Sequence, residues 1–253
     1  MDVAQEKLKL LTAAEVCAEC DLEADVAEWL EAKPDAATFL RQLTDAGHHM
    51  DAAQFLCNAL EPREAVWLAW DVGRLNATDD APDKVKQAVA ATHKWLTTLE
   101  DKDRRAAHDA SEVCGLDKAA GSAAYAAFYA AGSIGPEDLA EPIPVPAGIC
   151  AKMAAGAILF AAVEDPHNID ERVAASVAHW FTLAATEPPW GNPPVSDVAS
   201  VRIVKADAAK GDAKAAAADA APAAPGGEPP KPAAPKPDDS GYDDSGYNTD
   251  MKF

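Results

Sequence analysis

The chain has 253 residues, of which 59 are alanine and only 6% are aromatic, a bias that favours helices over strands. Its 42 acidic residues outnumber its 22 lysines and arginines, and the resulting net charge of −20 would repel the phosphate backbone of a nucleic acid. Five irregularly spaced cysteines, without a secretory leader before them, do not predict a disulfide framework, and we expect a cytoplasmic protein.

Changes in composition divide the chain into segments. The last 48 residues contain seven prolines but no Leu, Ile, Val or Trp, so they cannot bury enough apolar area to offset the entropy lost on ordering. The predicted segments are a flexible N-terminus at 1–9, an all-α domain at 10–186 with lobes at 10–75 and 83–186, a proline-rich linker at 187–205 with a β-like run at 201–204, and a disordered tail at 206–253.

Apolar residues recur with helical spacing throughout the predicted domain, and short polar or proline-containing breaks separate the runs. Thr12 and Glu15 form a capping-box pattern at the start of the first helix. The helices predicted after it span Leu22–Ala32, Ala36–Ala46, Met50–Leu60, Arg63–Leu75, Asp83–Leu99, Asp101–Cys114, Ala119–Ala131, Ile149–Val163 and Asp170–Thr186.

Short connections between these helices imply antiparallel neighbours. No alternating strand pattern precedes Val201, and the apolar run at Ala147–Val163 is shorter than the roughly 20 residues that a membrane span needs. We therefore predict an all-α fold without a membrane span, either an irregular multi-helix bundle or an αα-hairpin array. The sequence does not indicate an oligomeric state.

Two tryptophans and two arginines share one face of a predicted helix, because Arg63, Trp67, Trp70 and Arg74 follow the i, i+4, i+7, i+11 pattern. Tryptophan and arginine are common anchors in protein interfaces, so this face is a candidate partner-binding surface. The same pattern is also typical of a helix–helix contact inside the protein, and the sequence favours that interpretation.

A five-residue motif is repeated near the C-terminus, as Asp238–Tyr242 and again as Asp243–Tyr247. At the end of an Ala/Pro-rich segment, these repeats could be bound by a partner, with Tyr242 and Tyr247 as anchors. A tail that only increases solubility is the alternative, and the two interpretations are evenly balanced.

Metal and catalytic sites are not indicated by local motifs. Cys17 and Cys20 form the single CxxC, and the nearest further ligands, His48 and His49, are adjacent and should point in different directions. His93, His108 and His179 have no triad spacing around them, and nucleotide-binding and GxSxG motifs are absent from the sequence. We expect no metal and no cofactor, and these observations favour a non-enzymatic protein over an enzyme.

The run Leu60–Trp67, which reads LEPREAVW, resembles a bacterial family of unknown function whose members carry a REAVWWA helix. The helix end at Ala127–Ile134 and the loop at Pro142–Pro146 are similar to the AAFWSGGS end and proline-rich loop of that family. The similarity spans residues 10–186, with Leu68 where a second tryptophan is usual. The resemblance implies a place near type VI secretion genes and supplies no catalytic residue.

These observations together predict a non-enzymatic adaptor or accessory protein that binds one or more unidentified proteins, including components of a type VI secretion apparatus. Two alternatives belong to other classes. One is a hydrolase-type enzyme whose site is assembled in space, and the other is an effector or cargo protein delivered by the apparatus.

Overall fold

The computed structural model describes residues 7–8, 12–18, 20 and 22–191. These residues form ten α-helices and one 3-10 helix and contain isolated β-bridges but no β-strand, which confirms the predicted all-α class. The helices are α2 (Ala13–Cys17), α3 (Ala24–Ala27), η1 (Glu28–Ala32), α4 (Ala36–Ala46), α5 (His49–Ala59), α6 (Pro62–Asn76), α7 (Asp83–Thr98), α8 (Asp101–Cys114), α9 (Ala119–Phe128), α10 (Ile149–Val163) and α11 (Ile169–Leu183).

Local capping interactions place several helix ends where the sequence predicts them. Thr12 Oγ1 accepts a hydrogen bond from the Glu15 backbone N–H, and the Glu15 carboxylate accepts one from the Thr12 N–H, which completes the capping box of α2. Helix α4 ends at Gly47, whose φ of 84° suits glycine at this position. Pro62 opens α6, where its missing N–H leaves no helical hydrogen bond unmade.

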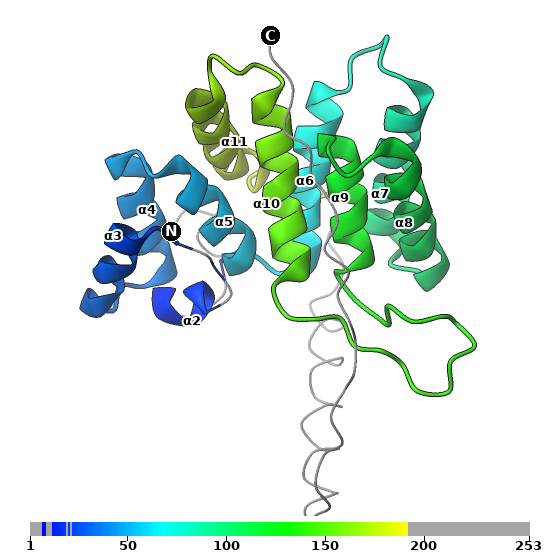
Figure 1. Cartoon of the computed structure of the whole chain (residues 1–253), viewed down its shortest axis with the longest axis horizontal. Helices are drawn as coiled ribbons and strands as arrows, with labels where there is room; N and C mark the ends of the chain where they lie inside the picture. Colours follow the sequence, from blue (N-terminus) through cyan, green and yellow to red (C-terminus); the bar gives the residue numbers. More distant parts are fainter. Residues whose placement is uncertain (1–6, 9–11, 19, 21, 192–253) are drawn as a thin grey trace, which may run out of the picture. The chain divides into compact units, whose positions relative to one another are not determined.

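Helices α6, α9 and α10 lie side by side in the middle of the domain, with α7 and α8 on one side and α5 and α11 on the other (Figure 1). Small residues let these central helices approach closely. Ser122 of α9 donates a hydrogen bond to the Met153 carbonyl of α10, and a Cβ on Gly73 of α6 would lie 3.2 Å from the Ala120 backbone. Alanine-rich faces therefore replace large side chains where helices meet.

Larger side chains fill the core between the N-terminal helices and α11. Phe39 of α4 packs edge to face on Phe55 of α5, and both rings are fully buried. Val173, Val177 and Trp180 of α11 are also fully buried. Because α5 and α6 pack against α10 and α11, residues of both predicted lobes contribute to one core.

Three features concern the limits of the domain. Lys7 and Leu8 already contact it, since Leu8 is buried and pairs with Leu60, so packed residues precede the predicted start at residue 10. The predicted tail at 206–253 and the run at 201–204 lie outside the described residues. None of the described helices has the length and apolar character needed to cross a bilayer.

Candidate functional site

The two tryptophans on one face of α6 lie in different environments, because different helices pack against the two ends of that face. Trp67 is 2% exposed and packs edge to face on Trp180 and Trp190, with ring-centroid distances of 6.1 and 5.3 Å. The Lys7 ammonium lies over the Trp67 ring, 4.7 Å from its centroid. Trp67 is therefore a core residue, and its indole is covered on several sides.

Arg63 also makes contacts within the domain. Its Nε donates a hydrogen bond of 3.1 Å to the Leu96 carbonyl near the end of α7, and Nη2 donates to the same oxygen. The guanidinium lies 4.1 Å from the centroid of the Trp190 ring, and burial lowers the pKa of Arg63 to about 10. Arg63 thus joins α6, α7 and the segment after α11.

Trp70 and Arg74, at the other end of this face, reach the surface. The Trp70 indole N–H donates a 3.0 Å hydrogen bond to the Val89 carbonyl of α7, and the ring stacks at a tilt on His93, with centroids 5.0 Å apart. The Arg74 guanidinium lies 5.4 Å from the centroid of the same Trp70 ring. The indole is half-buried, whereas Arg74 and His93 are exposed.

These side chains line an open hollow of about 450 Å³ between α6 and α7, which we call the α6–α7 hollow. Trp70 contributes an aromatic ring to its lining, and Arg74, Lys86 and His93 contribute basic side chains. One carboxylate, that of Asp79, is also present. The full lining comprises Trp70, Arg74, Ala77, Thr78, Asp79, Lys86, Val89, Ala90 and His93.

A buried carboxylate holds Arg74 in place. Asp71 is 4% exposed, and its Oδ1 accepts hydrogen bonds of 2.6 and 3.0 Å from Arg74. The other oxygen, Oδ2, lies 2.7 Å from Nε2 of His179 in α11. Because one carboxylate binds both groups, Asp71 fixes the guanidinium beside Trp70 and links α6 to α11.

Four of the six histidines have separate local contacts. His49 Nδ1 lies 2.9 Å from a carboxylate oxygen of Asp170, and His108 packs on Tyr125 and Phe128, with ring centroids 5.6 and 4.4 Å away. His93 and His179 belong to the α6–α7 hollow and to the Asp71 pair. The four side chains therefore occupy different places in the fold.

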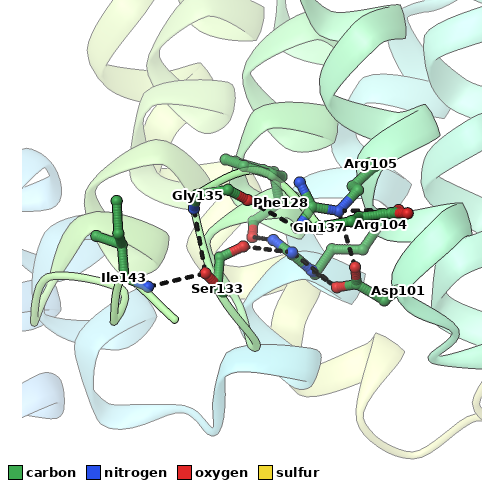
Figure 2. Close-up of polar contacts among 8 residues, drawn as sticks. All are labelled: Asp101, Arg104, Arg105, Phe128, Ser133, Gly135, Glu137 and Ile143. Carbon is green, nitrogen blue, oxygen red and sulfur yellow. Dashed lines mark hydrogen bonds and ion pairs between the residues drawn. The ribbon is translucent and has the colours of Figure 1, made fainter. Parts of the chain in front are cut away.

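A second polar cluster anchors the long loop after α9 (Figure 2). Arg104 of α8 is 2% exposed and donates hydrogen bonds of 2.6 Å to the carbonyls of Phe128 and Ser133. Ser133 Oγ in turn accepts from the backbone N–H groups of Gly135 and Ile143. This anchor ends α9 at Phe128, whereas the sequence predicts a helix to Ala131.

The sequence analysis did not single out Asp71 or Arg104, although weak patterns in the sequence indicate their contacts. Asp71 and Arg74 have the i, i+3 spacing of an intrahelical ion pair. Arg104 stands on one helical stripe with the small residues Ala107, Ser111 and Cys114, so it occupies a position that faces the core. No local pattern indicates that Lys86 and His93 approach Trp70. Tyr242 and Tyr247 lie outside the described residues.

Comparison with known proteins gives one match. No curated protein and no solved structure shows significant similarity to the chain. The match is to a group described as "Family of unknown function (DUF6931)" and covers residues 39–184, which include the α6–α7 hollow, the Asp71 pair and the Arg104 anchor. Residues 10–38, which the sequence resemblance also includes, precede the match. Because the match covers more than half of the 253 residues, the chain belongs to this family of unknown function.

Proposed function

We propose that the chain is a non-enzymatic adaptor or accessory protein that binds a protein partner through the α6–α7 hollow. The observation that carries this proposal is the exposed aromatic and basic surface formed by Trp70, Arg74, Lys86 and His93. Tryptophan and arginine provide much of the binding energy in protein interfaces. Asp71 holds the Arg74 side chain in position, which reduces the entropy lost when a partner binds.

The partner segment in this proposal carries an aromatic side chain beside a carboxylate. The aromatic ring would pack on Trp70 and His93, and the carboxylate would accept hydrogen bonds from Arg74 or Lys86. The net charge of −20 attracts a partner whose remaining surface is basic. Salt screens both the local and the long-range attraction, so binding should weaken as ionic strength rises.

Variants of the hollow test this proposal. The wild-type chain is used to isolate a partner, and its affinity is then measured against Trp70→Ala and Lys86→Glu. We expect each change to weaken binding roughly tenfold or more. Leu75→Ala is the control, because Leu75 is 57% exposed on the same helix but does not line the hollow. Equal affinity for all four proteins would refute the proposal.

A second contact is proposed for the repeated motif at the C-terminus. Tyr242 and Tyr247 each provide an aromatic anchor, and the adjacent aspartates suit a basic groove on the partner. Truncation after Lys205 and the double change Tyr242→Ala/Tyr247→Ala should then weaken partner binding to a similar extent. If both proteins bind like the full chain, the tail serves solubility rather than recognition.

We further propose that the partner belongs to a bacterial type VI secretion apparatus and that the chain acts in the cytoplasm. The resemblance of the Leu60–Trp67 helix supports the first part. The irregular spacing of the five cysteines supports the second part, because it does not predict the disulfide framework of an exported protein. Co-purification with contractile-sheath or phosphopeptide-binding proteins, encoded by neighbouring genes, is the expected outcome. Neighbouring genes without any secretion component would contradict this placement.

A further inference from the structure

The connection between α9 and α10, residues 129–148, is the longest between consecutive helices in the described part of the chain, and we call it the α9–α10 loop. It projects beyond the ends of the neighbouring helices (Figure 1). Every residue of its outer part, 136–144, is exposed. Connections of this length without a helix or strand are uncommon in compact domains and usually have a function.

Hydrogen bonds fasten both ends of the outer part to the domain. The Ile134 backbone N–H donates a 3.0 Å hydrogen bond to the Ile143 carbonyl, which joins the outgoing and returning segments. Arg105 of α8 donates a 2.9 Å hydrogen bond to the Gly135 carbonyl (Figure 2). These bonds restrict the conformations of the outer part, so a partner that binds it overcomes less conformational entropy.

Leu139 and Ile143 form one apolar patch on this loop. A Cβ on Gly135 would lie 3.1 Å from Leu139 Cδ2 and 3.1 Å from Ile143 Cδ1, so the two side chains meet over the backbone of this glycine. Gly135 is buried beneath them, whereas Leu139 and Ile143 remain 45% and 44% exposed. Apolar side chains that adjoin one another at the surface are typical of protein interaction sites, unlike those that are scattered singly.

Three prolines at alternate positions adjoin this patch. Pro142, Pro144 and Pro146 are all exposed, and each ring fixes its own backbone φ. The residue before each proline is restricted to extended conformations. Pro144 also pairs with Ser133 in an isolated antiparallel bridge. The run at 141–146 is therefore extended before any partner binds.

The charge of the loop is negative. Asp138 and Glu141 are exposed on either side of Leu139, and the sequence has no Lys, Arg or His from residue 135 to residue 151. A surface complementary to this loop is therefore apolar at its centre and basic at its edge. The same carboxylates disfavour an anionic lipid surface, which carries charge of the same sign.

We propose that the α9–α10 loop is a docking segment for a partner protein whose groove is lined by aromatic side chains and flanked by lysines or arginines. Aromatic-lined grooves bind extended, proline-rich segments because these lose little conformational entropy on binding. Asp138 and Glu141 form ion pairs at the edge of the groove. The proposal does not depend on the α6–α7 hollow, because none of the residues that line the hollow belongs to the loop.

Photo-cross-linking in cells, with the full chain, tests the position and the chemistry of the contact. Benzoylphenylalanine is placed at Leu139 in one protein and at Val113 of α8, which is 63% exposed, in a control. Mass spectrometry then identifies the cross-linked protein and the residue that reacted. We expect the Leu139 position to react within a groove that contains Trp or Tyr and adjacent Lys or Arg, and the Val113 position not to react with that groove.

Affinities for the purified cross-linked partner test which side chains matter. Leu139→Asp and the double change Pro142→Ala/Pro144→Ala should each weaken binding roughly tenfold or more, whereas Val113→Asp is the matched control and should bind like the wild type. Melting temperatures check that the variants are folded. A synthetic peptide of residues 135–147 should compete with the wild-type chain, a result that does not depend on the folding of any variant.

Three outcomes overturn this proposal. The first is the absence of a cross-linked protein specific to the Leu139 position, and the second is a reacting surface without aromatic side chains. The third is a partner that binds the loop variants like the wild type. If that partner is instead lost by Trp70→Ala, it belongs to the α6–α7 hollow, so the function proposed for the hollow stands while the loop proposal fails.

Discussion

Arg104 donates a hydrogen bond from Nη1 to the carbonyl oxygen of Phe128, 2.6 Å away, and its guanidinium also lies 4.6 Å from the centroid of the Phe128 ring. The same side chain binds the Ser133 carbonyl through Nη2 and the Asp101 carboxylate through Nε. One buried arginine thereby ends α9 and holds the start of the loop that leads to α10 (Figure 2).

Arg104→Met should lower the free energy of unfolding by about 3–5 kcal/mol, because it leaves two carbonyl oxygens of the loop without their donor. Urea denaturation measures this loss. Arg105→Met is the matched control: Arg105 is more exposed and donates to the Gly135 carbonyl, so its loss should be smaller. Equal losses would contradict a special role for Arg104.

Gly132→Ala should destabilise the domain more than Gly47→Ala. Both glycines have positive φ, 73° and 84°, so an alanine is strained at either position. A Cβ on Gly132 would also lie 3.1 Å from Nε of Arg104, whereas one on Gly47 has no neighbour within 4 Å. The added crowding predicts about 1–3 kcal/mol of further loss at Gly132, measurable by urea denaturation of both variants. A larger loss at Gly47 would refute this account.

Trp67→Ala and Trp70→Ala should differ in their effects on stability and binding, because Trp67 lies in the core and Trp70 lines the α6–α7 hollow. Loss of the buried Trp67 indole should lower the free energy of unfolding by about 3–5 kcal/mol. Trp70 is half-buried, so its loss should lower stability by only about 1–2 kcal/mol while weakening partner binding. Denaturation and binding measured on both variants check this. Larger destabilisation by Trp70→Ala would reverse the assignment.

Glu64→Gln should stabilise the protein at alkaline pH. Burial raises the pKa of Glu64 to about 7 from an ordinary value of 4.5, although the Lys7 ammonium, 3.8 Å away, lowers it. Between these two values the folded state holds a proton that the unfolded chain has released, so the free energy of unfolding falls as pH rises. Glutamine carries no charge, and at pH 8 the variant should be more stable by about 1–3 kcal/mol.

The comparison of Glu64→Gln with the wild type is made by urea denaturation at pH 4.5 and at pH 8. The advantage of the variant should almost disappear at the lower pH, where the wild-type carboxyl is protonated in the folded state and about half protonated in the unfolded one. Glu31→Gln, which changes an exposed carboxylate, should show no such pH-dependent gain. An advantage of equal size at both pH values would contradict the raised pKa of Glu64.

Helix positions were predictable because they depend on interactions between residues close in the chain. The capping box at Thr12 and Glu15, the proline at the start of α6 and the glycine after α4 each satisfy or replace backbone hydrogen bonds within one turn. Apolar residues that recur at helical spacing then define the buried side of each helix. The all-α class follows from these local signals alone.

The environment of each side chain on a helix depends on which other helices lie beside it. Trp67 and Trp70 are equivalent in the helical pattern, yet Trp67 meets Trp180 and Trp190 while Trp70 meets His93 and an open hollow. Nothing within α6 distinguishes the two. Their difference arises from the packing of α11 and α7.

Composition and local periodicity thus determined the all-α class and most helix boundaries of this protein. Only the tertiary structure decided that Arg104 reaches the Phe128 and Ser133 carbonyls and that His179 pairs with Asp71. The physical reason is distance along the chain: local hydrogen bonding and helical period act over a few residues, whereas these contacts join segments 24 or more residues apart and form only when helices pack.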